Sequence, residues 1–136
     1  MCYHFLCYEI PSFKLNNKNR LAGSIFSEIT ETKYQHTPDI DDIEVFEKLF
    51  SGIQNLLKSK KILAMHDISD GGLITTLLEM CFTKKVGMRM DLDDSSGVNE
   101  FLFSEEIGFA IQIKKNNLDE VTNTLKNENI YVKNIA

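Results

Sequence analysis

The sequence predicts one α/β domain, with helices packed on a mixed sheet in two layers, and three observations support this prediction. Several segments repeat apolar residues at the spacing of a helix, and others alternate apolar and polar residues as strands do. These segments interleave along the chain, and no repeat, linker or low-complexity segment interrupts them. A chain of 136 residues supports one core with little room for a second. We therefore expect a single domain over residues 1–136.

The N-terminal run MCYHFLCYEI is apolar and aromatic and predicts a strand. It is too short to span a bilayer, and it lacks the basic start and small-residue cleavage site of a signal peptide. A short helix is expected to follow, with one apolar face made of Leu21, Ile25 and Ile29. Gly23 and Ser24 lie inside that expected helix, where either close packing or backbone access to a phosphate would explain them.

The longest expected helix opens at Thr37-Pro38-Asp39 and ends near Lys61. Its apolar positions recur at helical spacing and predict a core face. They are Ile43, Phe46, Leu49, Phe50, Ile53, Leu56 and Leu57. Its acidic start and basic end both complement the helix dipole, so neither run of charge requires a metal or a partner.

The stretch from Lys61 to Phe82 is the most informative, because an apolar strand runs into polar residues and paired glycines before an amphipathic helix. Gly71 and Gly72 fall at the start of that helix, where N–H groups lack intrahelical partners and the dipole is positive. Either Asp70 or Ser69 is expected to cap the helix. This layout favours a phosphate site, although the same residues are also common in ordinary turns.

Four further side chains are candidates for the same site. Asp67 offers hard oxygen ligands suited to Mg²⁺ bound to phosphate, and His66 could orient the loop or contact a substrate. Glu105 and Glu106 precede a later strand and could bind Mg²⁺ or orient a substrate amine. In an extended segment these two carboxylates point to opposite faces, so we expect at most one of them to reach a given site.

The remaining elements follow from alternation and capping. Asn117 with Glu120 three residues later is a variant of the capping box and predicts the start of the last helix. The expected order in this half is a strand at 88–92, a solvated loop at 93–99, a strand at 109–113, a helix, and a strand at 130–132.

Composition excludes several classes of function. A net charge of −5 without a basic stripe argues against nucleic-acid binding, and no segment suggests a membrane span. Three cysteines, at positions 2, 7 and 81, are odd in number and lack the close pairs of a zinc site. We therefore expect neither disulfides nor a structural metal, and a reducing cytoplasm as the location.

Three segments of the chain resemble the C-terminal-type domain of a known enzyme family. They are RLAGSIFSEI at 20–29, HDISDGGLITTLLEMCF at 66–82 and FLFSEEIGFAIQI at 101–113. That family includes aminoimidazole ribonucleotide synthetase, selenophosphate synthetase and phosphoribosylformylglycinamidine synthase. The likeness also includes HTPDIDD at 36–42, where the family tends to carry a Pro-Asp segment. It is closest to the large, single-chain phosphoribosylformylglycinamidine synthases.

The resemblance implies an ATP-dependent ligase of de novo purine synthesis, which converts formylglycinamide ribonucleotide to its amidine with ammonia released from glutamine. It implies Mg²⁺ as cofactor, and ATP either as substrate or, with ADP, as an auxiliary nucleotide. No catalytic residue is assigned. The roles implied are a Mg²⁺ ligand for Asp67, nucleotide contacts for Ser69, Gly71 and Gly72, and loop or substrate contacts for His66, Asp70, Glu105 and Glu106.

The resemblance also implies partners. A nucleotide-binding synthetase domain would precede this one and a glutaminase domain would follow it, so the chain alone is expected to be inactive. Its start at Met1, close to the domain, suggests a fragment, a split subunit or an incomplete gene model. Two alternatives stay open, a non-catalytic scaffold that keeps the fold and a relative of selenophosphate or aminoimidazole ribonucleotide synthetase.

Overall fold

The computed structural model describes residues 8–83, 86–92 and 97–135. Its strands are β1 (Tyr8–Glu9), β2 (Pro11–Lys14), β3 (Ile62–Asp67), β4 (Gly108–Lys114) and β5 (Tyr131–Asn134). Its helices are α1 (Ile25–Ile29), α2 (Ile43–Lys58), α3 (Gly72–Phe82), α4 (Val98–Phe103) and α5 (Leu118–Lys126), and a 3₁₀ turn (Lys115–Asn117) precedes α5. None of the helices in these ranges is both long and apolar enough to cross a membrane.

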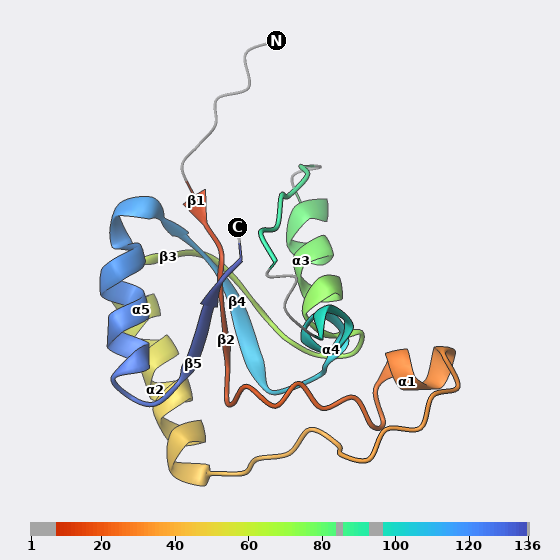
Figure 1. The fold of residues 1–136 in the computed structure, drawn as a ribbon. Coiled ribbons are helices and arrows are strands. Elements are labelled where there is room, and N and C mark those ends of the chain that lie inside the picture. Colours follow the sequence, from red (N-terminus) through yellow and green to blue (C-terminus); the bar gives the residue numbers. More distant parts are fainter. Residues whose placement is uncertain (1–7, 84–85, 93–96, 136) are drawn as a thin grey trace.

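Strand β4 is the centre of the sheet (Figure 1). Strand β3 pairs with one edge of β4. Strands β1 and β2 pair with the other edge of β4 in one continuous register, and β5 pairs with β2. The predicted α/β class, with helices packed on a sheet, is confirmed. The described pairings are all antiparallel, however, where the sequence predicted a mixed sheet. Strands β4 and β5, which α5 connects, run in the same direction but do not pair with each other. Strand β5 pairs instead with β2, which is antiparallel to both.

Helices cover both faces of the sheet, where the sequence predicted two layers (Figure 1). Alternation along β4 separates two cores, because Ile111 and Ile113 point to one face and Ala110 to the other. The first core joins the sheet to α2 and α5 through residues such as Leu49, Ile53, Leu56, Val121 and Leu125. The second joins it to α3 and α4 through Leu73, Leu77 and Phe101. The helical periods of α3 and α5 thus predicted buried faces correctly. The predicted core face of α2 is confirmed only in part, because Ile43, Phe50 and Leu57 are exposed.

Two helices begin later than expected. The carboxylate of Asp42 accepts hydrogen bonds from the N–H groups of Glu44 and Val45, so α2 begins at Ile43 and not near Thr37. Ser24 lies at the N-cap of α1 and not inside it, and its hydroxyl accepts the N–H of Ser27 at 3.2 Å. In both cases a side-chain acceptor satisfies the first free N–H groups and thereby sets the boundary.

Three further local features differ from the prediction, wholly or in part. Residues 88–92 form no strand, although Met88 and Met90 pack against the second core and the Asp91 N–H bonds to the Ile135 carbonyl. Helix α4 was not predicted. Helix α5 does begin directly after Asn117, as predicted, but Asn117 makes no side-chain cap, and Glu120 pairs instead with Lys61. The expected N-terminal strand begins at Tyr8 within the described part, and residues 1–7 and 93–96 lie outside it.

Candidate functional site

Two hydrogen bonds hold the start of the turn between β3 and α3, at Asp67 and Ile68. The N–H of Ile68 donates to the carbonyl of Gly108 at 2.9 Å. The hydroxyl of Thr76, buried on α3, donates to the carbonyl of Asp67 at 3.1 Å. Ser69 and Asp70, which follow these two residues, are exposed. The turn therefore presents polar side chains to solvent from a fixed backbone.

The two glycines at the start of α3 have structural roles in this turn. Both have positive φ, 84° for Gly71 and 73° for Gly72. A Cβ atom on Gly72 would lie 2.6 Å from the carbonyl carbon of Phe103, so only glycine lets α3 approach the end of α4 this closely. The residue at the N-cap is Gly71, and it has no side-chain cap, so the expectation that Ser69 or Asp70 caps the helix was wrong.

The N–H groups that we expected to be open to phosphate both have partners within the chain. The N–H of Gly72 donates to the carbonyl of Ser69 at 2.9 Å. The N–H of Gly71 donates to Oε1 of Glu105 at 2.9 Å, and the same oxygen accepts the N–H of Ile25 at 3.0 Å. The negative charge at the start of α3 is therefore a carboxylate of the protein itself.

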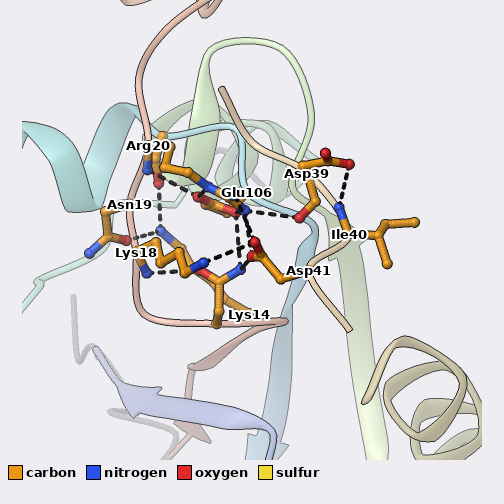
Figure 2. A network of polar contacts seen from close by, with 10 residues as sticks. Lys14, Lys18, Asn19, Arg20, Asp39, Ile40, Asp41 and Glu106 are labelled. Atoms are coloured by element: carbon orange, nitrogen blue, oxygen red, sulfur yellow. Dashed lines mark hydrogen bonds and ion pairs between the residues drawn. The ribbon is translucent and has the colours of Figure 1, made fainter. Parts of the chain in front are cut away.

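Glu106 points away from this turn and is fully buried. Its two oxygens form a bidentate pair with Arg20, at 2.6 Å to Nε and 2.8 Å to Nη2, and Oε1 also accepts the Arg20 N–H at 3.0 Å (Figure 2). The expectation that Glu105 and Glu106 reach opposite faces is thus confirmed. Of the two, only Glu105 contacts the turn after β3.

The buried pair extends to an acidic residue at the surface. Arg20 donates from Nη1 to Asp41 at 3.2 Å, and Lys18 contacts the same Asp41 oxygen at 2.9 Å (Figure 2). The hydrogen bond to Glu106 raises the pKa of Arg20, while bonds from Lys18 and then Arg20 lower the pKa of Asp41. The network ties the 36–42 segment to the segment that contains Glu106.

Lys14 is a further buried charge, and the sequence did not predict it as a site residue. Its Nζ donates to Asn19 Oδ1 at 2.8 Å, to Ser104 Oγ at 2.8 Å and to the Phe101 carbonyl at 3.1 Å. Burial, opposed by the charge of Glu106, lowers its pKa to about 8. Alternation along β2 puts Lys14 and Phe13 on opposite faces of the sheet. It does not indicate that helices cover the face of Lys14 as well as the face of Phe13.

His66 lies between two carboxylates beside the turn. Its Nε2 is 2.8 Å from Oε2 of Glu79 on α3, and its Nδ1 is 3.4 Å from Oδ1 of Asp67. The side chain of Asp67 is 67% exposed. Within the ranges that the structure describes, no three His, Cys, Asp or Glu side chains gather to hold a metal ion. One exposed carboxylate does fit Mg²⁺ that takes its other ligands from phosphate and water.

The structure therefore groups most of the predicted site residues and separates one. His66, Asp67, Ser69, Asp70 and both glycines belong to one turn, Glu105 contacts that turn, and Glu106 does not. A separate groove of about 830 Å³ lies between α2 and α5, on the other face of the sheet, and its walls include Lys48, Asn55 and Glu120. Cys81 is free and buried in α3.

Comparison with known proteins gives the same family along most of the chain. Residues 13–136 match the family described as AIR synthase related protein, C-terminal domain. A probable phosphoribosylformylglycinamidine synthase of Arabidopsis thaliana, named chloroplastic/mitochondrial, is 41% identical over 111 residues, which are 80% of this chain and 8% of that protein. The phosphoribosylformylglycinamidine synthase of Schizosaccharomyces pombe is 41% identical over 99 residues, which are 72% of this chain and 8% of that protein.

Solved structures share the fold at low sequence identity. Thermotoga maritima PurL complexed with ATP matches with a TM-score of 0.72 and 12% identity over 95% of this chain and 21% of that one. PurLQS from the same organism matches with a TM-score of 0.70, again at 12% identity over 95% of this chain and 21% of that one. This chain spans about 8% of the length of the curated relatives. It belongs to the AIR synthase related protein family, as a C-terminal domain similar to part of the phosphoribosylformylglycinamidine synthases.

Proposed function

We propose that this domain is part of an ATP-dependent ligase of purine biosynthesis that converts formylglycinamide ribonucleotide to its amidine. The names of its relatives support this reaction, and one observation in the structure supports it most. The carboxylate of Glu105 bonds to Ile25 and Gly71, so the three segments that resemble the family, separate in sequence, meet at one end of the sheet.

The turn after β3 would form one wall of a nucleotide site that a partner domain completes. The exposed carboxylate of Asp67 is suited to Mg²⁺ that also binds phosphate oxygens, and the exposed Ser69 hydroxyl is suited to donate to the nucleotide. His66, which contacts Glu79, would orient Asp67. The N–H groups of Gly71 and Gly72 have partners, so the glycines would serve the site by shaping its backbone.

The proposed reaction balances in two steps. The γ-phosphoryl group of ATP moves to the amide oxygen of the substrate and the amide nitrogen loses its proton to water, giving ADP and an iminophosphate. Ammonia from glutamine then attacks the imidate carbon and inorganic phosphate leaves, giving the amidine. Mg²⁺ when bound neutralises phosphate charge, and the domain's own part is to hold groups in position. No residue of this chain is assigned a proton transfer.

Two further domains are part of the proposal. A nucleotide-binding synthetase domain would face the turn, and a glutaminase domain would supply ammonia. The site on this domain would hold either the reacting ATP or an auxiliary ADP or ATP. A cytoplasmic location also stays a proposal, because the Arabidopsis relative is named chloroplastic/mitochondrial.

Calorimetric titration of Mg²⁺ and ATP tests the proposed nucleotide site. The ligand is added to this chain alone, and then to the chain mixed with the upstream nucleotide-binding domain of a relative. We expect binding only in the mixture and at least 10-fold weaker binding for Asp67→Asn, which should fold normally because Asp67 is exposed. Asp119→Asn, at the exposed start of α5, is the matched control. Absence of binding in every mixture would contradict the proposal.

A non-catalytic assembly domain is the second candidate, and one observation favours it. Helix α2 exposes Ile43, Phe50 and Leu57 at seven-residue spacing, in a stripe beside its buried Leu49 and Ile53. Exposed apolar stripes of this kind suit contact with another protein surface. This candidate predicts that Asp67→Ala and Ser69→Ala leave every partner and ligand interaction intact, which the same titrations would detect.

A further inference from the structure

Glu105 lies between two residues that are held by buried cations. Ser104 and Glu106 are both fully buried. The hydroxyl of Ser104 accepts a hydrogen bond from Nζ of Lys14 at 2.8 Å, and Glu106 is held by Arg20. Both cations come from the N-terminal part of the chain. The backbone on each side of Glu105 is therefore fixed, which limits where its side chain can reach.

The side chain of Glu105 joins two elements that do not follow each other in the chain. Its Oε1 accepts the N–H of Ile25, the first residue of α1, at 3.0 Å. It also accepts the N–H of Gly71, at the N-cap of α3, at 2.9 Å. A carboxylate that accepts two backbone N–H groups makes charge-assisted bonds, which are stronger than bonds between neutral groups. One side chain thus sets the position of α1 relative to the turn after β3.

We infer that Glu105 is a positioning residue that holds the start of α1 and the Ser69–Gly72 turn together as one unit. Its carboxylate fills the position at Gly71 that a phosphate would otherwise take. Consequently Glu105 would act on a nucleotide indirectly, by fixing where the exposed Ser69 and Asp67 side chains lie. That consequence rests on the proposed function, whereas the coupling of the two elements does not.

A different role for Glu105 makes the opposite prediction. If an incoming phosphate displaced Glu105 from the Gly71 N–H, the carboxylate would be a competitor, because two anions cannot share that donor. Removing the carboxylate would then strengthen nucleotide binding. A positioning role requires that its removal weaken binding.

Amide hydrogen exchange followed by NMR on the whole chain tests the coupling directly. For Glu105→Ala we expect exchange at the Gly71 and Ile25 amides to rise together by about 10-fold or more, because both lose a bond to a charged acceptor. For Glu105→Gln, exchange at these two amides should rise less, because the side-chain amide oxygen still accepts their hydrogen bonds. Exchange within α2 should not change, which would establish that the variants stay folded. Glu47→Ala, exposed on α2, is the control. A rise at only one of the two amides, or at neither, would overturn the inference.

The same variants in the titration with Mg²⁺ and ATP separate the two roles. Weaker binding by at least 10-fold for Glu105→Ala, with partial rescue by Glu105→Gln, would support positioning. Equal or tighter binding for Glu105→Ala would overturn it in favour of competition. If the wild-type mixture does not bind, the proposed nucleotide site fails, and the exchange rates alone then decide whether Glu105 couples the two elements.

Discussion

Replacing Glu106 with glutamine should destabilise the fold, and the structure indicates by how much. The Glu106 side chain is 1% exposed and makes a bidentate pair with Arg20, whose side chain is 11% exposed. Glutamine would keep the shape but present an NH₂ group to the N–H donors of Arg20. Removing one member of a buried pair typically costs about 3–5 kcal/mol, because the remaining charge stays buried without compensation. Arg20 keeps its contacts to Asp41 and the Asp39 carbonyl, so we expect about 2–4 kcal/mol.

Urea denaturation of this variant has a matched control in the same chain. Glu128 also pairs with a cation, Lys48, but the two charged atoms lie 3.9 Å apart and the Glu128 side chain is 49% exposed. Glu128→Gln should therefore cost less than about 1 kcal/mol. If Glu106→Gln and Glu128→Gln lowered the free energy of unfolding by the same amount, burial would not be the cause of the loss.

Three further changes test the packing and electrostatics. Gly72→Ala should cost about 2–5 kcal/mol by thermal denaturation, through its positive φ and a clash with α4, while Gly87→Ala, with open space around it, should stay within about 0.5 kcal/mol of wild type. Leu77→Ala should cost about 2–5 kcal/mol in urea, and exposed Leu78→Ala less than about 1 kcal/mol. Burial lowers the pKa of Lys14 from 10.5 to about 8, so folding releases a proton between these pH values. The free energy of unfolding should rise there by up to about 1.4 kcal/mol per pH unit relative to Lys14→Met, and equal slopes would contradict this.

Helices with a long apolar period were predictable from the sequence. The buried Leu49, Ile53 and Leu56 of α2 recur at helical spacing, and so do the buried Leu73 and Leu77 of α3. Helix α4 has only six residues and a glycine at its N-cap without a side-chain cap, so local signals were too weak to reveal it. The number of layers was not predictable either, because it depends on which helices pack on each face.

The turn of the candidate site was predictable because its residues are neighbours in the sequence. Its supporting network was not, because Arg20 and Glu106 are far apart in the chain and each alone resembles a surface charge. The contact of Glu105 with the Gly71 N–H was likewise not predictable. The strand, turn and paired glycines before α3 had predicted that this N–H would bind phosphate. These contacts join polar groups that are distant in sequence. The spacing of apolar residues in helices and strands gives no information about which polar groups will pair.

The most direct test of the proposed site is to locate a paramagnetic substitute for Mg²⁺. Mn²⁺ with ATP is added to labelled chain mixed with the upstream nucleotide-binding domain, and the broadening of each amide resonance is measured. We expect selective broadening from His66 to Gly72 that is lost in Asp67→Asn, with the groove between α2 and α5 unaffected. Broadening centred on that groove, or none near Asp67, would contradict it.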